Sequence, residues 1–295
     1  MLQSYSFCPE QDVEALHELI VECWQAYGPV VTFHVGDLHW RLRPQPERLP
    51  EQDIRLWYNE ADKLRALAWF DPPNSGDILC HPTVDRTVVE PALLEWLENK
   101  ARSQNVADFT VVAFESDSLR EELLTARGYQ KQSDFLHHMQ RQLDHPIVTA
   151  DIKEGYFVST TAAADLLSLS NAIASVFGSD PKPVSAYEAL RSSPFYRNDL
   201  DIVIKSERGE VVAFCLAWLD EKNKVGLLEP VGCHPEHRRL GLASAAVRTA
   251  LKALKSADAQ TSVLHHAGDS HSAFKLYKKC GFTPLANDYD WTIVL

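Results

Sequence analysis

Residues 228–243 of the chain read Leu-Glu-Pro-Val-Gly-Cys-His-Pro-Glu-His-Arg-Arg-Leu-Gly-Leu-Ala, which predicts a strand leading through a basic turn into a helix. Gly241 and Ala243 lie in the first helical turn, where small side chains let a ligand come close. A helix begins with unpaired N–H groups and a partial positive charge, and Arg238 and Arg239 add cationic donors. These features favour a pyrophosphate site, with an ordinary strand-turn-helix carrying solvated arginines as the equal alternative.

The chain also contains an internal repeat. The triplet Cys-His-Pro occurs at residues 80–82 and again at 233–235, an offset of 153 residues (233 − 80). Gly128 and Gly281 share this offset, as do Leu123 and Leu276. Because the offset is close to half of the 295 residues, the repeat predicts two tandem copies of one domain.

The coarse pattern of secondary structure agrees with two copies. Short apolar runs bounded by turn residues predict strands at 64–70 and 211–219, each followed by a hairpin loop. Later strands are expected at 110–114 and 261–265, and apolar residues at helical spacing predict a helix over 243–254. This order indicates an α/β (α+β) fold with a mixed sheet. We place the boundary within 144–155 and expect domains at residues 1–145 and 146–295.

Composition narrows the functional classes. The 29 basic and 41 acidic residues give a net charge of −12, which disfavours nucleic acid or an anionic membrane as a partner. The longest apolar run, Val211 to Leu219, is too short to cross a bilayer, and no signal peptide is expected at the N-terminus. The six scattered cysteines indicate reduced thiols and a cytoplasmic protein. We expect no metal site, and we interpret the histidines at 265, 266 and 271 as a strand end and polar loop.

Two motifs resemble the GNAT superfamily of acyl-CoA-dependent N-acetyltransferases. The run Arg238-Arg239-Leu240-Gly241-Leu242-Ala243 fits the family signature Arg/Gln-x-x-Gly-x-Gly/Ala, and residues 276–282 fit a second signature, Leu-Tyr-x-x-x-Gly-Phe. The pair lies in the family's order and spacing. The resemblance is clear over residues 211–295, and it implies two tandem GNAT-like domains, each a mixed, mostly antiparallel sheet flanked by helices.

The resemblance also implies roles for individual residues. In the family, the strand before the signature separates from its neighbour and binds the pantetheine arm of acetyl-CoA, the acyl donor. Tyr277 matches the family's general acid, and Glu229 is the candidate general base. Ser270 stands where many relatives have asparagine, which puts its contact with the cofactor in doubt. The implied cofactor contacts are the strand backbone of Val231, Gly232 and Cys233, the guanidinium of Arg238, and the N–H groups of Arg239, Leu240, Gly241, Leu242, Ala243 and Ser244.

The first copy lacks key residues of both motifs. At the offset of 153 residues, Val88 corresponds to Gly241 and Leu124 corresponds to Tyr277. We therefore interpret residues 1–145 as a degenerate copy that does not bind acetyl-CoA productively. The expected function is transfer of an acetyl group from acetyl-CoA to the primary amine of a small molecule, by direct attack through a tetrahedral intermediate. A catalytically silent acyl-CoA-binding or interaction scaffold is the alternative. The acceptor, the length of the acyl group and the choice between monomer and homodimer stay open.

Overall fold

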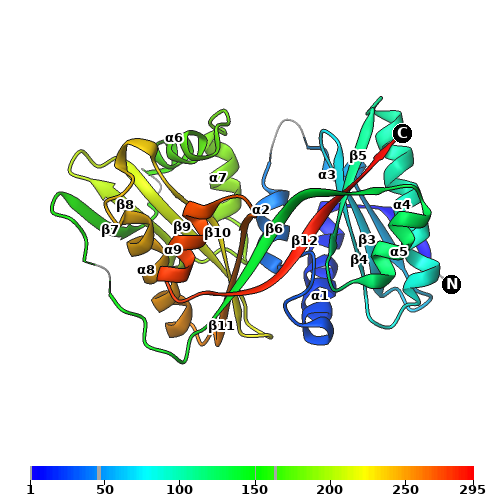
Figure 1. Cartoon of the computed structure of the whole chain (residues 1–295), viewed down its shortest axis with the longest axis horizontal. Coiled ribbons are helices and arrows are strands. Elements are labelled where there is room, and N and C mark those ends of the chain that lie inside the picture. The colour runs from blue at the N-terminus through cyan, green and yellow to red at the C-terminus, as the bar shows by residue number, and fades with distance from the viewer. Residues whose placement is uncertain (1, 45–47, 150, 163–164) are drawn as a thin grey trace. The chain divides into compact units, whose positions relative to one another are not determined.

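The computed structural model of the chain describes residues 2–44, 48–149, 151–162 and 165–295 (Figure 1). The described residues form two compact units, neither of which is continuous in sequence. Unit 1 contains the residues up to 34, those from 48 to 138, and residues 285–295. Unit 2 contains residues 35–44 and the described residues from 139 to 284. No helix in the described ranges is long and apolar enough to cross a membrane.

The strands of unit 1 pair in the order β1-β2-β3-β4-β5-β12. All pairs are antiparallel except β4 with β5. The final strand, β12, pairs with β5 so that Asp288 lies opposite Phe114 and Val294 opposite Asp108. The strands are β1 (Gln3–Ser6), β2 (Ile54–Tyr58), β3 (Leu64–Asp71), β4 (Ser75–Cys80), β5 (Asp108–Phe114) and β12 (Thr283–Val294), while β6 (Gln130–Gln142) continues from unit 1 into unit 2.

The helices of unit 1 include one that covers its central strands. Helix α4 buries Leu93, Leu94, Leu97 and Ala101 and packs on β3 and β4. Trp291 of β12 is buried in the same apolar cluster. The helices of this unit are α1 (Pro9–Tyr27), α3 (Pro50–Asp53), α4 (Arg86–Ser103) and α5 (Ser118–Ala126).

Unit 2 has the strand order β11-β10-β9-β8-β7, in which β10 and β11 are parallel and the other pairs antiparallel. Its strands are β7 (Tyr156–Thr160), β8 (Asp201–Ser206), β9 (Val211–Asp220), β10 (Val225–Cys233) and β11 (Thr261–Ala267). Its helices are α2 (Val35–Leu42), α6 (Leu166–Phe177), α7 (Val184–Arg191), α8 (Leu242–Ser256) and α9 (His271–Lys279), with short 3₁₀ turns η2 (Asn198–Leu200) and η3 (Pro235–His237).

Helices cover both faces of the unit 2 sheet. Successive strand side chains point to opposite faces, and β9 follows this rule. Ala213 and Cys215 pack in the cluster built around α8, whereas Phe214 packs with Leu169 of α6. Of the apolar residues whose spacing predicts α8, Val247, Ala250, Leu251 and Leu254 are buried, whereas Ala243 is half-buried.

The mixed sheet flanked by helices confirms the predicted fold class. The predicted repeat is visible in the elements themselves. Strand β5 and helix α5 begin at Asp108 and Ser118, and β11 and α9 begin 153 residues later, at Thr261 and His271. Each pair also has equal length. The order of strand, helix and turn is therefore the same in the last part of both copies.

Candidate functional site

Strands β10 and β11 separate partway along their length. They pair from Val225–Thr261 to Leu227–Val263, and beyond that point both strands continue, to Cys233 and Ala267, without further pairing between them. Backbone N–H and C=O groups need partners. The segment of β10 that contains Val231, Gly232 and Cys233 therefore has one backbone edge that does not pair with β11. The resemblance assigns this segment to the pantetheine arm.

An irregularity in β10 lies at the start of this separation. The register between β9 and β10 shifts between Leu228 and Val231, so that β10 has one residue more than β9 there. Such a bulge redirects a side chain. The indole N–H of Trp218 donates a hydrogen bond to the carbonyl of Glu229 at 2.9 Å. This hydrogen bond fixes the backbone of Glu229 at the bulge. Pro230, the next residue, has no N–H to donate.

The turn after β10 is held by its own hydrogen bonds. The Arg238 guanidinium donates through Nε to the carbonyl of Cys233 at 3.2 Å, and the ring Nδ1 of His237 lies 2.9 Å from the hydroxyl of Tyr156. Arg239 has a left-handed backbone conformation, with φ of 68°. These contacts direct the chain from the end of the strand into α8.

The start of α8 is open. Gly241 is the N-cap residue, with φ of 82°, and no side chain caps the helix. The first helical bond runs from the Ala245 N–H to the Gly241 carbonyl, so the N–H groups of Leu242, Ala243 and Ser244 have no partner within the helix. A Cβ placed on Gly241 would have no described atom within 4 Å. Leu240 precedes this point and is half-buried.

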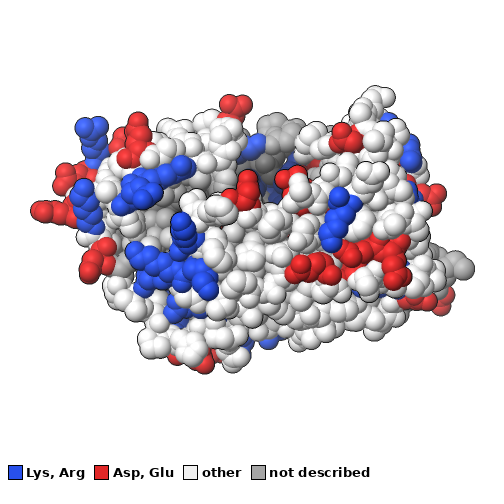
Figure 2. All heavy atoms as spheres, viewed as in Figure 1, with Lys and Arg blue, Asp and Glu red and all other residues white. Residues whose placement is uncertain are grey.

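Basic side chains gather around this helix start. Figure 2 shows Lys and Arg clustered over the region where Figure 1 places α8 and α9. Arg238 and Arg239 are exposed before α8, and Lys275, Lys278 and Lys279 are exposed on α9. The protein as a whole is acidic, with a net charge of −12, so this local excess of positive charge favours an anion at this place in particular.

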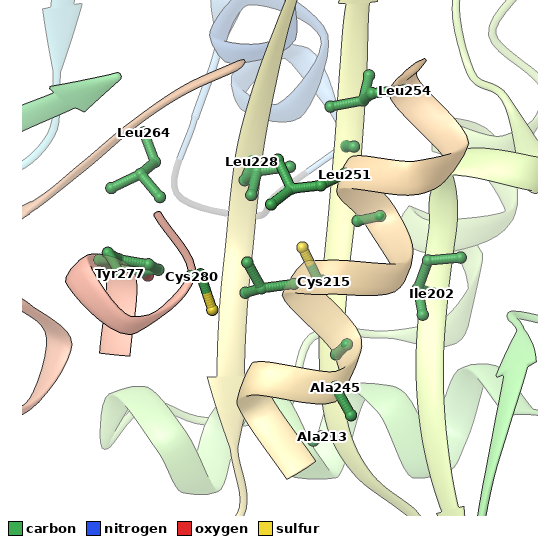
Figure 3. Packing of buried hydrophobic residues seen from close by; sticks show 14 of the residues in the cluster. Ile202, Ala213, Cys215, Leu228, Ala245, Leu251, Leu254, Leu264, Tyr277 and Cys280 are labelled. Atoms are coloured by element: carbon green, nitrogen blue, oxygen red, sulfur yellow. The ribbon is translucent and has the colours of Figure 1, made fainter. Parts of the chain in front are cut away.

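Tyr277 lies on the buried side of α9. It is 6% exposed and belongs to the same cluster as Leu264, Cys215 and Cys280 (Figure 3). Burial raises the pKa of the Tyr277 phenol, and nearby Cys215, Cys280 and Glu229 raise this pKa further. The phenol therefore keeps its proton at neutral pH and can serve as a proton donor.

A short series of polar side-chain contacts connects helices α8 and α9. The Ser244 hydroxyl lies 3.5 Å from the Cys280 sulfur and accepts a hydrogen bond from Arg248 Nε at 3.2 Å. Arg248 also donates to the carbonyl of Lys279 at 2.7 Å. The Ser244 side chain is thus engaged inside the protein. Ser270 is the N-cap residue of α9, and its side chain makes no capping hydrogen bond.

Glu229 has two neighbours that sequence reasoning did not find. His265 Nε2 lies 3.7 Å from Glu229 Oε2, and the two side chains are 28% and 27% exposed. A carboxylate oxygen of Asp37, a nitrogen of His265 and an oxygen of Glu229 all lie within 4.8 Å of one another. Asp37 comes from α2, in the other half of the sequence, and no motif there indicated it.

A small pocket, with about 20 Å³ of space open to a water-sized probe, lies in unit 2 beside the bulge. Tyr187 and Tyr196 line this pocket, Phe195 stacks on His39, and Phe177 is 58% exposed. The pocket is lined by Trp40, Leu166, Leu169, Ile173, Tyr187, Leu190, Arg191, Tyr196, Asp201, Phe214, Leu216 and Pro230.

In unit 1, the helix start that corresponds to that of α8 is the start of α4, and it is capped by a side chain. The N-cap side chain of Asp85 accepts a hydrogen bond from the Thr87 N–H, so the start of α4 is capped from within. Glu90, fully buried, is bound by Arg86 at 2.7 Å and by Arg120 at 2.8 Å. This region is therefore filled by protein charges that satisfy one another.

Comparisons with known proteins give a family for part of the chain. Residues 166–282 match the model of the acetyltransferase (GNAT) family. No curated protein sequence matches the chain.

Solved structures match over nearly the whole chain. A tandem GNAT protein from the clavulanic acid biosynthesis pathway is 15% identical, with a TM-score of 0.73 over 100% of this chain and 98% of that one. A GCN5-related N-acetyltransferase from Sphaerobacter thermophilus is 19% identical, with a TM-score of 0.67 over 99% of this chain and 95% of that one. N-myristoyltransferase from Saccharomyces cerevisiae, with bound myristoyl-CoA, is 11% identical, with a TM-score of 0.62 over 99% and 78%. These similarities show a fold of two tandem GNAT-like domains.

Proposed function

We propose that the chain, whose residues 166–282 match the model of the acetyltransferase (GNAT) family, transfers an acetyl group from acetyl-CoA to the primary amine of a small molecule. Acetyl-CoA supplies the acyl group as a thioester. The other parts of the reaction fall to this chain: binding the donor, orienting the acceptor, removing a proton from the amine and protonating the departing thiolate.

The observation that carries the proposal is the open start of α8 beside the separated strands β10 and β11. Free N–H groups and the helix dipole favour a pyrophosphate, and exposed Arg238 and Arg239 add charge. The free edge of β10 between Val231 and Cys233 supports the binding of an extended amide-containing arm next to that pyrophosphate. An anion site and an extended site in sequence match the two chemical parts of CoA.

Two side chains have the chemistry for the proton transfers. An amine is mostly protonated at neutral pH and must lose a proton before it attacks a thioester. Glu229, at the bulge, is the proposed base, and a positioned base contributes about 10²- to 10⁴-fold to a rate. Tyr277 is the proposed acid, because it occupies the tyrosine position of the second signature and its buried phenol is protonated at neutral pH.

The proposed division of labour assigns acetyl-CoA to residues 146–295 and leaves residues 1–145 without a donor site. The internally capped start of α4 supports this assignment, since Asp85 and Glu90 place carboxylates where a pyrophosphate would otherwise bind.

The test is thiol release from acetyl-CoA in the presence of a chemically diverse panel of amines, together with the thermal stability of the protein in acetyl-CoA. We expect stabilisation by acetyl-CoA and amine-dependent thiol release, both lost or strongly reduced in the matching variants described below. Stabilisation without thiol release for any amine would instead support the silent acyl-CoA-binding scaffold, and absence of both would contradict either reading.

A further inference from the structure

The C-terminal end of α9, the helix that carries Tyr277, is held by two arginine side chains. The last C=O groups of a helix have no partners within it. The guanidinium of Arg141 donates to the carbonyl of Cys280, the C-cap residue of α9. The guanidinium of Arg248 donates to the carbonyl of Lys279, the last helical residue, at 2.7 Å. Both arginines thus place positive charge at the end of the helix where the dipole is negative, which stabilises the helix.

Arg141 is a buried cation whose described hydrogen-bond acceptors are both neutral. It lies near the end of β6 and is 8% exposed. Besides the Cys280 carbonyl, it binds the carbonyl of Pro146 at 2.9 Å, and its buried Nε makes no hydrogen bond with any described residue. Burial lowers the pKa of this guanidinium, because removal from water disfavours the charged form. Arg141 therefore does not serve a buried carboxylate, as Arg120 of unit 1 serves Glu90.

The residue after the cap makes room for this guanidinium. Gly281 is the glycine of the second signature, and its φ of 87° is a left-handed conformation that favours glycine. A Cβ on Gly281 would lie 2.9 Å from Cζ of Arg141. The glycine therefore both turns the chain out of α9 and leaves the space that Arg141 occupies.

Helix α9 has few other anchors. It has nine residues, and a helix of this length is marginal on its own in water. Its N-cap residue, Ser270, makes no capping hydrogen bond through its side chain, and Tyr277 is the only buried residue within the helix. Phe274 and Leu276 are half-buried, and Phe282 is buried just beyond the end. The place of the Tyr277 phenol therefore depends on how the C-terminal end of α9 is held.

The two arginines differ in what else they hold. Arg248 Nε donates to the hydroxyl of Ser244 at 3.2 Å, in the first turn of α8, where the pyrophosphate is proposed to bind. Neither described hydrogen bond of Arg141 reaches α8, since its second acceptor, Pro146, lies between β6 and β7. A change at Arg141 should therefore affect α9 and leave the proposed donor site in place.

We infer that Arg141 is a positioning residue for the proposed acid. By holding the C-terminal end of α9, it keeps the Tyr277 phenol where it can protonate the departing thiolate. Arg141 bonds to the backbone, so its effect on the reaction passes through the position of the phenol. A misplacement of about 1 Å can cost about 10²-fold in rate. The inference rests on the proposed function.

The test compares Arg141→Met with a matched control in the full chain. Arg141→Met keeps an unbranched side chain and removes the donors, while Arg141→Lys retains a cationic donor. The control is Arg127→Met, because Arg127 binds Glu98 at 2.7 Å at the end of α5, the helix that corresponds to α9 in the first copy. Hydrogen exchange of the amides of residues 271–280, followed by mass spectrometry without acetyl-CoA, measures local opening of α9. Thiol release gives kcat and the KM for acetyl-CoA.

In Arg141→Met we expect faster exchange over residues 271–280 and a kcat lower by about 10- to 10²-fold, with the KM for acetyl-CoA nearly unchanged. Arg141→Lys should recover part of both losses, and Arg127→Met should change none of the three quantities. Exchange over residues 271–280 as slow in Arg141→Met as in Arg127→Met would overturn the inference.

A double-mutant cycle with Tyr277→Phe tests whether the effect passes through the phenol. If it does, the double variant with Arg141→Met should have the same kcat as Tyr277→Phe alone, because residues that act as a unit are not additive. A further loss in the double variant, as large as the loss in Arg141→Met alone, would overturn the inference. If Arg141→Met does not fold, Arg141→Lys replaces it in the cycle. If no amine gives thiol release, the proposed function fails, and the exchange comparison still decides whether Arg141 holds α9.

Discussion

At the scale of single residues, the site depends on the environment that the fold gives to two ionisable groups. Tyr277 is buried and keeps its proton, whereas Glu229 is partly exposed and has a basic neighbour in His265. Each role can be tested by a substitution that changes one functional group and little volume.

Replacing Tyr277 with Phe removes the phenol oxygen. If Tyr277 protonates the thiolate, the rate of thiol release at saturating substrates should fall about 10²- to 10⁴-fold, while the KM for acetyl-CoA changes little. The control is Tyr129→Phe, because Tyr129 is also buried and its pKa is also raised by burial. A Tyr277→Phe enzyme as fast as Tyr129→Phe would exclude Tyr277 as the acid.

At the scale of elements, the two copies differ at the start of one helix. The start of α8 is open at Gly241, and the start of α4 is capped by Asp85 and lies beside the buried Glu90 cluster. The same position in the repeat can therefore bind a ligand in one copy and stabilise the fold in the other.

Gly241→Glu should abolish binding of acetyl-CoA, because a carboxylate would lie at the start of α8 and repel the pyrophosphate. The strain of a side chain at φ of 82° adds a cost that must be separated from this effect. Gly178→Glu supplies that control, since Gly178 is also left-handed, with φ of 67° and ψ of 32°, and a Cβ on it would have no described atom within 4 Å. Val88→Glu, on the exposed surface of α4, tests the first copy.

Binding of acetyl-CoA is measured in each variant as thermal stabilisation of the protein by acetyl-CoA. We expect this stabilisation to vanish in Gly241→Glu and to persist in Gly178→Glu and Val88→Glu. Equal loss in Gly241→Glu and Val88→Glu would refute the assignment of the donor site to the second copy.

The Glu90 cluster predicts a dependence of stability on pH. Burial alone would raise the pKa of Glu90, but Arg120 and Arg86 outweigh it and hold the pKa below its ordinary value. A carboxyl with a lowered folded-state pKa stabilises the protein above its unfolded pKa of about 4.3. This stabilising contribution is lost as the pH falls through the pKa that Glu90 has in the folded protein.

Glu90→Gln should therefore lower the free energy of unfolding by about 3–5 kcal/mol at neutral pH, because it leaves buried arginines without their partner. The difference from the wild type should shrink as the pH falls below 4.3. Urea unfolding followed by circular dichroism measures both. Glu95→Gln, at an exposed position of the same helix, should change stability little, and an equal loss in both variants would contradict this role of the cluster.

At the scale of the whole molecule, each half of the sequence contributes one segment to the unit that consists mostly of the other half. Residues 35–44 belong to unit 2, and residues 285–295 belong to unit 1. A fragment of residues 146–295 therefore lacks α2 and also lacks β5, with which β12 pairs. We expect this fragment to melt at a lower temperature than the full chain and to bind hydrophobic dyes.

The control for the fragment is a full chain cut at a protease site inserted at residues 144–149. It keeps every residue and should retain the dye binding and melting temperature of the intact protein. A fragment of residues 146–295 as stable as this nicked chain would show that the exchanged segments contribute little.

The limits of sequence reasoning follow from this exchange. The turn at Arg238–Gly241 and the helix after it could be predicted, because glycine placement, charge and helical periodicity are local properties of the sequence. Short apolar runs also predicted strands at 110–114 and 261–265, which lie within β5 and β11. The neighbourhood of Asp37 and Glu229 could not be predicted, because periodicity identifies a helix but does not identify the strands on which it packs. The assignment of catalytic roles to Glu229 and Tyr277 stays a prediction.

The pairing of β12 with β5 has a consequence for biosynthesis. Residues 108–114 leave the ribosome long before their partners at 288–294 are made, at a synthesis rate of about 5–20 residues per second. During that interval β5 has an unoccupied edge, which is the kind of surface that chaperones protect and that promotes association between nascent chains. The first unit to be translated is thus completed only when the last residues of the second half have emerged.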